Sequence, residues 1–218
     1  MDNSIGTLNE RSVHAFLKLY FEPNRDSHEI KIGGFVADIV GENGIIEIQT
    51  GSFGYLKKKL KAFLEVGHVT VVYPVITGTT VINTDTGRKY KSPRKKTKYN
   101  FLSQAYNIRE FLADERLHFV LVLMAVSQEK SGSGKTASKS DRKPEKIIDE
   151  ITLESILDWH IFTDELPESF NQKEFEAKTR VYGRDGWGSL QTLISVGLIS
   201  QTHKEGNTKI YKKLCQKI

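Results

Sequence analysis

Apolar residues recur at two different spacings in the first third of the chain, and the two spacings predict different elements. A helical stripe over residues 8–21 is formed by Leu8, Val13, Phe16, Leu17 and Tyr20. Residues 29–40 favour a strand that bends at Gly33–Gly34, and residues 45–50 favour a second strand after a turn. Helices repeat every 3.6 residues and strands every two, which separates these segments. The pattern therefore predicts a helix followed by a β-hairpin.

The next stretch alternates helices and strands. Residues 52–66 predict a basic amphipathic helix, and residues 100–112 predict a second helix. Between them, residues 69–75 form a near-continuous apolar run, which is typical of a strand covered on both faces. Residues 81–91 favour a hairpin, and residues 117–126 favour another buried strand. We expect an α/β domain over residues 1–127, with a mixed sheet flanked by helices.

The segment after this domain changes character. Residues 127–146 are rich in Ser, Gly and Lys and carry few large apolar side chains, so we expect a flexible linker over residues 128–149. The remaining residues, 150–218, favour helices at 151–162, after Asn171 and at 186–196, followed by a hairpin over 199–213. Three helices and a two-stranded hairpin are the order of a winged helix.

Composition and charge narrow the class of protein. The chain has 218 residues, a hydrophobic content of 38%, a net charge of +5 and a pI near 9.1. This size and content support a folded core, and the basic excess fits a nucleic-acid partner. The single cysteine, Cys215, excludes an internal disulfide and a cysteine-based zinc site, so we expect a cytoplasmic protein. No signal peptide or membrane-length apolar run is visible, and we expect no membrane partner.

Two carboxylates in the predicted hairpin are the strongest candidates for chemistry. Asp38 lies near the end of the first strand, and Glu47 and Gln49 share one face of the second. A hairpin can bring Asp38 close to Glu47, and paired carboxylates bind hard divalent cations through oxygen. The alternative is an ordinary solvent-facing strand with polar residues.

This arrangement resembles the PD-(D/E)XK nuclease superfamily, whose core is restriction-endonuclease-like. Asp38 matches its Asp and Glu47 its acid, while Gln49 stands where Lys is usual. The resemblance implies that Asp38, Glu47 and the backbone carbonyl of Ile48 hold Mg²⁺ or Mn²⁺, and that Gln49 orients the attacking water. Glu10, on the first helix, matches an extra acid of many members. The implied function is metal-dependent hydrolysis of DNA phosphodiester bonds, in restriction or anti-phage defence.

The flanking run Ile46-Glu-Ile-Gln-Thr-Gly-Ser-Phe53 and the tail are also similar to an uncharacterised prokaryotic family with a nuclease-like first half and a winged-helix tail. That likeness brings no established activity. Because Gln49 replaces Lys, the alternatives are a DNA-binding protein that has lost catalysis or an interaction module of a defence complex. Restriction enzymes often dimerise, so a homodimer is a further expectation, without an identifiable interface.

Basic residues in the first domain are candidates for phosphate contact. Lys57 and Lys58 lie on the helix after the acidic strand, with Lys59 and Lys61. These lysines bind phosphates, supply the missing lysine from a different position, or form a solvated face. The run from Arg88 to Lys98 has seven basic residues in eleven and includes Arg94, Lys95 and Lys96. We expect it to contact DNA phosphates as a loop.

His14 lies four residues after Glu10, on the same helical face. It is expected either to contact a phosphate or to be a partly buried histidine. In the tail, the third helix would present Arg184, Ser189 and Gln191 to DNA, and the hairpin would add Lys204, Lys209 and Lys212. The tail would thus deliver the nuclease site to duplex DNA. Winged helices also mediate protein contacts, which is the alternative.

Overall fold

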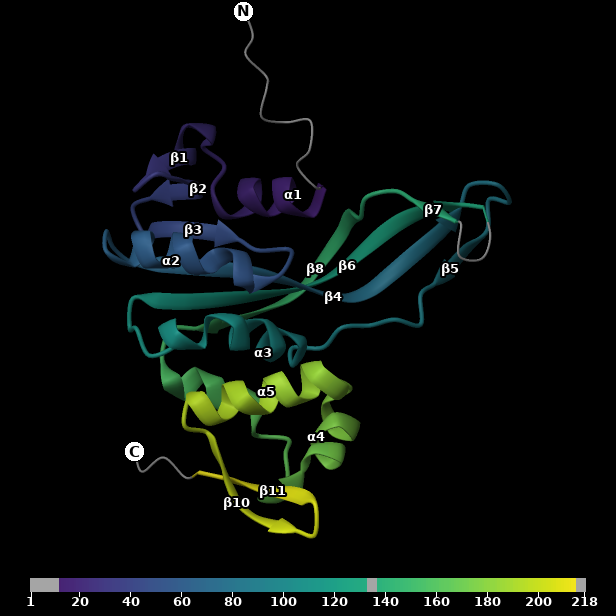
Figure 1. The fold of residues 1–218 in the computed structure, drawn as a ribbon. Helices are drawn as coiled ribbons and strands as arrows, with labels where there is room; N and C mark the ends of the chain where they lie inside the picture. Colours follow the sequence, from purple (N-terminus) through teal and green to yellow (C-terminus); the bar gives the residue numbers. More distant parts are fainter. Residues whose placement is uncertain (1–11, 133–136, 215–218) are drawn as a thin grey trace, which may run out of the picture.

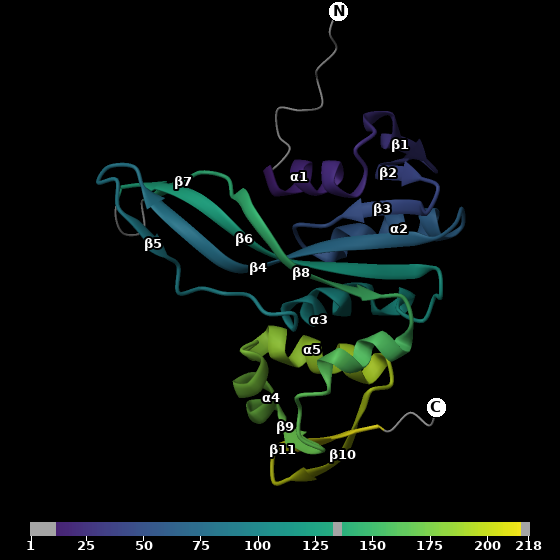
Figure 2. The ribbon, with the colours of Figure 1, turned by 180° about the vertical axis from the view of Figure 1, so that it is seen from behind.

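A mixed α/β architecture is built around one large sheet. The computed structural model describes residues 12–132 and 137–214. Within these ranges, an eight-stranded mixed sheet runs in the order β1-β2-β3-β4-β6-β7, with β5 paired to β4 and β8 paired to β6. Figures 1 and 2 show helices on both faces of this sheet and a small C-terminal unit beyond α3. The predicted class, a mixed sheet flanked by helices, is confirmed at this level.

The N-terminal part is a helix and an antiparallel meander. It comprises α1 (Ser12–Phe21), β1 (His28–Ile32), β2 (Phe35–Gly41) and β3 (Gly44–Ile48). The single bent strand predicted over 29–40 is two strands, because Gly33 and Gly34 adopt φ of 56° and 81° and reverse the chain. The hairpin of β2 and β3 is present as predicted. Gly44 has φ of 99°, and a Cβ there would lie 2.6 Å from the carbonyl oxygen of His68.

Two crossovers then extend the sheet with parallel strands. The 3₁₀ turn η2 (Phe53–Leu56) and α2 (Lys57–Leu64) connect β3 to β4 (Val69–Asn83), which pairs parallel to β3. After β5 (Lys89–Lys91), the helical segment α3 (Asn100–Ala105) and η3 (Tyr106–Phe111) lead to β6 (Leu117–Ser131), parallel to β4. Apolar strands covered by crossover helices on the sheet faces explain why 69–75 and 117–126 lack alternation.

Strands β4 and β6 are longer than their apolar cores. Each has 15 residues, and they stay paired from Val69–Leu117 to Asn83–Lys130. Their second halves, together with β5 and β7 (Ser138–Lys139), project from the body as an arm (Figure 1). The sequence predicted the buried halves and the hairpin over residues 81–91, which is the pairing of β4 with β5. The rest of the arm was not predicted, because its side chains are polar and partly exposed.

The predicted flexible linker over 128–149 is wrong for its described part. Residues 127–131 end β6, and β8 (Lys143–Leu153) is an 11-residue strand paired antiparallel to β6. The helix predicted at 151–162 is corrected as well: β8 continues to Leu153, and only η5 (Ile156–Phe162) is helical. Most side chains of β8 face solvent, so the segment lacks the apolar signal by which a strand is recognised.

The C-terminal unit consists of β9 (Ser169–Asn171), α4 (Gln172–Thr179), α5 (Gly183–Ser195), β10 (Ile199–Glu205) and β11 (Thr208–Lys213). Its three strands form a separate antiparallel sheet in the order β10-β11-β9. The helix predicted after Asn171 is α4, and a capping box begins it: the Asn171 side chain accepts a hydrogen bond from the backbone amide of Glu174 at 3.1 Å, and the Glu174 side chain accepts one from the backbone amide of Asn171 at 2.8 Å.

The core joins both halves of the chain. Phe101 and Phe119 of the main body pack against Trp159 and Phe162 of η5. A second apolar cluster lies under α1 on the other face of the sheet and includes Leu17, with Ile39, Ile48, Val72 and Met124. None of the described helices has the length and apolar character needed to cross a bilayer.

Candidate functional site

Asp38 and Glu47 lie together where β2 and β3 separate. The pairing of the two strands ends at Ile39 and Ile46. Asp38 directly precedes Ile39 in β2, and Glu47 directly follows Ile46 in β3. The amide of Asp38 donates to Oε1 of Glu47 at 3.2 Å, and the amide of Ile48 donates to Oδ2 of Asp38 at 2.8 Å. The hairpin therefore brings the two carboxylates together, and the backbone of Ile48 lies against them.

Two basic side chains from different helices complete the cluster. His14 of α1 places Nε2 at 3.2 Å from Oδ2 of Asp38. Lys59 of α2 places Nζ at 2.7 Å from Oε2 of Glu47. The four residues thus come from a helix, two strands and a crossover helix, and hydrogen bonds and ion pairs join them into one cluster.

The two acids hold their protons differently. Glu47 is 2% exposed, and this burial, together with the charge of Asp38, raises its pKa to about 7 against the opposing effect of Lys59. Burial acts to raise the pKa of Asp38 as well. The hydrogen bond and charge of His14, the hydrogen bond from the Ile48 amide and the charge of Lys59 outweigh burial, so the pKa of Asp38 lies below its usual value. One negative charge is therefore fixed on Asp38, while Glu47 titrates near neutrality.

Gln49 has a different neighbour from the two carboxylates. The side-chain Nε2 of Gln49 donates to the carbonyl oxygen of Ser52 at 2.9 Å. Its backbone amide donates to the carbonyl oxygen of Val72, which continues the parallel pairing of β3 and β4. The side chain thus ties the end of β3 to the loop before η2. Glu10 lies outside the described residues.

The donor set of this cluster fits a hard cation. Mg²⁺ is usually held by one or two carboxylates and keeps several waters, and Asp38 and Glu47 supply such oxygens. Burial and, after it, the charge of Asp38 raise the pKa of Glu47, and a divalent cation would relieve the repulsion between the pair. Among residues 12–132 and 137–214, no group of three or more His, Cys, Asp and Glu side chains is arranged for a metal. Asp38, Glu47, the backbone carbonyl of Ile48 and solvent would be the ligands.

The lysines of α2 separate into different environments. Lys57 pairs with Glu110 at 2.7 Å, and Lys58 is exposed. Lys59 instead turns inward, with Nζ also 5.9 Å from the ring centroid of Phe63. A sequence signal for this exists: Lys59 precedes Leu60 and stands four residues before Phe63, at the border of the apolar stripe.

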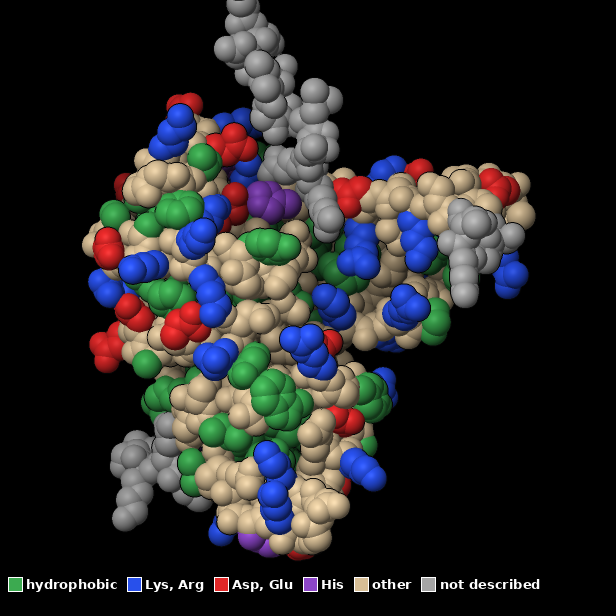
Figure 3. Space-filling model, viewed as in Figure 1, with side chains coloured by type: hydrophobic (Ala, Val, Ile, Leu, Met, Phe, Trp, Pro, Cys, Tyr) green, Lys and Arg blue, Asp and Glu red, His purple; other side chains and the backbone are tan. Residues whose placement is uncertain are grey.

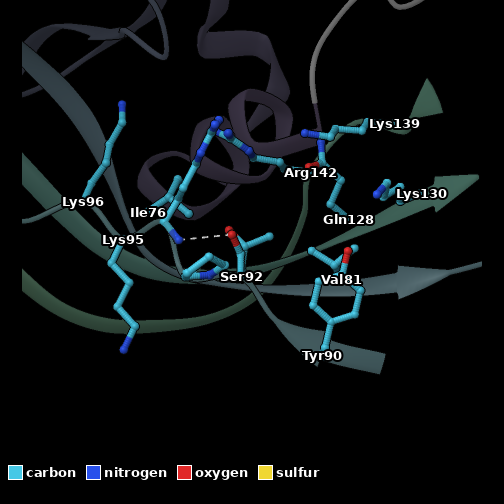
Figure 4. A pocket seen from close by; sticks show the side chains of 13 residues that line it. Ile76, Val81, Tyr90, Ser92, Lys95, Lys96, Gln128, Lys130, Lys139 and Arg142 are labelled. Carbon is cyan, nitrogen blue, oxygen red and sulfur yellow. Dashed lines mark hydrogen bonds between the residues drawn. The ribbon is translucent and has the colours of Figure 1, made fainter. Parts of the chain in front are cut away.

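The basic loop Arg94-Lys95-Lys96 lines a groove at the base of the arm, and all three side chains are exposed (Figure 4). Lys96 donates to the hydroxyl of Tyr73 at 3.2 Å, which fixes the loop to β4. This placement leaves the prediction of a phosphate-contacting loop open to test.

The third helix of the tail differs most from expectation. Ser189 is fully buried and its hydroxyl donates to the carbonyl of Asp185, so it does not face a ligand, and its predicted contact with DNA is wrong in this structure. Thr192 on the same helix donates to the carbonyl oxygen of Leu102 at 2.8 Å, because α5 packs against α3. Arg184 is exposed and Gln191 is half-buried. The hairpin lysines Lys204, Lys209 and Lys212 are exposed, as expected for a wing.

Comparison with known proteins places the chain in a family. Residues 11–163 match the model of a family described as a domain of unknown function, DUF8091, and the chain belongs to this family. An uncharacterized protein of Treponema pallidum (strain Nichols) is 28% identical over 227 residues, covering 96% of this chain and 88% of the relative. No solved structure matches the chain. The family match extends through β8 and η5, so it includes the segment predicted as a linker.

Proposed function

We propose that this protein is a Mg²⁺- or Mn²⁺-dependent DNA endonuclease that hydrolyses phosphodiester bonds at Asp38 and Glu47. The observation that carries the proposal is the cluster itself: two carboxylates linked through the backbone amides of Asp38 and Ile48, with a lysine ammonium 2.7 Å from one of them. A buried acid pair of this kind is costly unless it is paired or binds a cation. Because the acid pair lies beside a lysine and a histidine, we favour an active site over an ordinary solvent-facing strand with polar residues.

Lys59 supplies what Gln49 lacks. In the resemblance, a lysine two positions after the acid stabilises charge and orients water, and this chain has Gln49 there. Lys59 reaches Glu47 from the crossover helix and carries the same ammonium group to the same carboxylate. The missing lysine is therefore replaced from a different element, which supports an active site over one that has lost catalysis.

Each residue of the cluster has a separate role in the proposed hydrolysis. Bound Mg²⁺ would supply Lewis acidity at the phosphate and lower the pKa of water. His14 donates to Asp38 and favours its ionised form, and Glu47 in its deprotonated form would supply the second anionic oxygen ligand. Lys59 then holds positive charge beside the reacting phosphate. Gln49, bound to Ser52, fixes the loop at the carboxyl end of β3.

The order of elements supports a restriction-endonuclease-like core with a winged-helix unit. The helix α1, the meander β1-β2-β3, the crossover α2, and the parallel strands β4 and β6 follow the sequence of that core. In the C-terminal unit, β9, α4, α5 and the hairpin β10–β11 follow the order of a winged helix. A role in restriction or defence against foreign DNA, in the cytoplasm, is part of this proposal.

Plasmid cleavage tests the function. Supercoiled DNA incubated with the purified protein should be nicked or linearised with Mg²⁺ or Mn²⁺ and left intact with EDTA. Asp38→Ala and Glu47→Ala should each abolish cleavage while their melting curves show a folded protein, and Glu42→Ala, in the exposed turn at the other end of the hairpin, should retain it. Equal cleavage by wild type and both variants would refute the site. A wild type that binds DNA without cutting it would favour the catalytically inactive alternative.

A further inference from the structure

A basic groove lies where the arm leaves the body. Two adjoining cavities of about 430 and 380 Å³ occupy this place. They share the side chains of Ile76, Lys96, Gln128, Lys139 and Arg142, so they form one continuous groove. Figure 3 shows Lys and Arg side chains around the hollow beside the arm, and Figure 4 shows several of the lining side chains.

The cations of the groove come from separate parts of the chain. Lys96 follows β5, Lys130 is near the end of β6, Lys139 is in β7, and Arg142 directly precedes β8. In Figure 4, Lys139, Arg142 and Gln128 lie near one another, across the groove from Lys96. Only the sheet topology brings these positions together, because more than thirty residues separate Lys96 from Lys130.

The groove has an excess of positive charge. Asp141 is its acidic lining residue, and Oδ2 of Asp141 accepts a hydrogen bond from the amide of Ser12. Within residues 12–132 and 137–214, neither Lys139 nor Arg142 pairs with a carboxylate. A concave surface lined by one sign of charge focuses the field and attracts an opposite polyion.

The groove leads toward the carboxylate pair. Its second cavity is lined by Val13, the neighbour of His14 in α1, and by Thr50, which directly follows Gln49. A chain of phosphates lying in the groove would therefore pass beside the ends of α1 and β3 that carry the candidate site. A repeated anion of this kind is the backbone of a nucleic acid.

We propose that this groove, rather than helix α5, is the main DNA-binding surface, and that it holds the backbone of duplex DNA along the arm. That the bound polyanion is DNA rests on the proposed function. Where it binds is inferred from the charge and shape of the groove alone. The docking of α5 on α3 buries Ser189 and Thr192, so only part of the face expected of a recognition helix stays accessible.

Binding without cleavage tests the location. The full-length protein is titrated in EDTA against a fluorescent duplex of about 25 base pairs, at salt concentrations from about 50 to about 300 mM. The variant K96Q/K139Q/R142Q removes three groove cations and should bind at least about tenfold more weakly, with a log–log salt slope smaller by about 2 to 3. The matched control R25Q/K31Q/K173Q removes one exposed arginine and two exposed lysines outside the groove and should bind like wild type.

Three results would overturn the location: equal binding by the groove variant, equal weakening in both variants, or a wild type that does not bind duplex DNA at about 50 mM salt. Melting curves of both triple variants establish that each is folded. Cleavage separates the two proposals. DNA bound through the groove but never cut would refute the nuclease and leave the groove standing. Cutting that needs Asp38 and Glu47 but not the groove cations would refute the groove alone.

Discussion

The Nζ atom of Lys59 lies 2.7 Å from Oε2 of Glu47, although the two residues belong to a helix and a strand separated by the η2 turn. The exposed fractions of the two side chains are 27% and 2%, so the contact joins a partly accessible cation to a buried acid. This ion pair connects the crossover helix to the strand that carries the candidate chemistry.

Removing this lysine should reduce cleavage more than binding. Lys59→Met keeps the length of the side chain against Phe63 but removes the ammonium, so we expect single-turnover cleavage to fall by about 100-fold or more, the scale of losing a charge-stabilising group. Lys58→Met, the exposed neighbour, is the matched control and should stay within a few-fold of wild type. Cleavage by Lys59→Met at the wild-type rate would remove Lys59 from the mechanism.

A lysine at position 49 should restore part of that loss. Gln49 lies two residues after Glu47, directly past the end of β3, so Gln49→Lys offers an ammonium at the position that the nuclease resemblance predicts. We expect Gln49→Lys alone to retain or raise activity, and the double variant Lys59→Met/Gln49→Lys to exceed Lys59→Met. The measurement is single-turnover cleavage with metal affinity determined in parallel. A large fall in Gln49→Lys with unchanged metal affinity would give the glutamine a specific role.

Stability should depend on pH through Glu47. Its folded-state pKa of about 7 lies above the ordinary value of 4.5, so the native state holds this proton more tightly than the unfolded state. The stabilisation is fully present below about pH 4.5 and is lost as pH rises through about 7. The lowered pKa of Asp38 acts with the opposite sign, and only below about pH 4, outside this window.

Urea unfolding at a series of pH values measures this effect. Glu47→Gln has no titrating group, so the difference in unfolding free energy between this variant and wild type should grow in favour of the variant from about pH 4.5 to 7 and then level off. Adding Mg²⁺ should stabilise wild type above pH 7 and leave Glu47→Gln nearly unchanged. A difference that is independent of pH would contradict the raised pKa.

The C-terminal unit should depend on the main body for its stability. Trp159 and Phe162 pack against Phe101 and Phe119, and Thr192 donates to the backbone of Leu102. We expect residues 150–218 alone to be unfolded or molten, which reverses the expectation of an independent DNA-delivery domain. Circular dichroism and ¹H–¹⁵N spectra of the fragment decide the point. A dispersed spectrum and a cooperative melt would show that the unit folds by itself.

In the full chain, the contact between α3 and α5 can be weakened without removing apolar surface. Thr192→Val deletes the buried hydroxyl and leaves the Leu102 carbonyl without its hydrogen bond, which should cost about 1–3 kcal/mol. Thr202→Val, at an exposed position in β10, is the control and should cost less. A single cooperative unfolding transition in both variants is expected if the core is shared. Two separate transitions would indicate independent units.

The sequence predicted the centre of the fold well because the centre obeys simple periodicity. The strands around Val71 and Leu121 are buried on both faces, and the hairpin of β2 and β3 has a glycine turn, so both are visible as patterns. Apart from the hairpin of β4 and β5, the arm and β8 were missed, because their side chains face solvent and their strands are held by backbone pairing. Backbone hydrogen bonds leave no mark in the sequence.

The candidate site was predictable in part for the same reason. Register alone brings Asp38 to Glu47, so the pair could be inferred from the hairpin. The choice of Lys59 among three adjacent lysines depends on the rotation of α2 over the sheet, which is decided by the packing of Phe63 and Leu60. The burial of Ser189 depends on the contact of α5 with α3, a relationship between distant segments that local pattern does not contain.

Anomalous scattering from Mn²⁺ tests the central claim most directly. Crystals grown or soaked with Mn²⁺ should show a peak between Asp38 and Glu47, roughly 2.1 Å from an oxygen of each, the distance typical of a small hard cation. Lys59 should move away from Glu47 as the ion takes its place beside Oε2. A well-occupied Mn²⁺ elsewhere in the same crystals, with no peak beside these carboxylates at saturating metal, would contradict the proposed metal site.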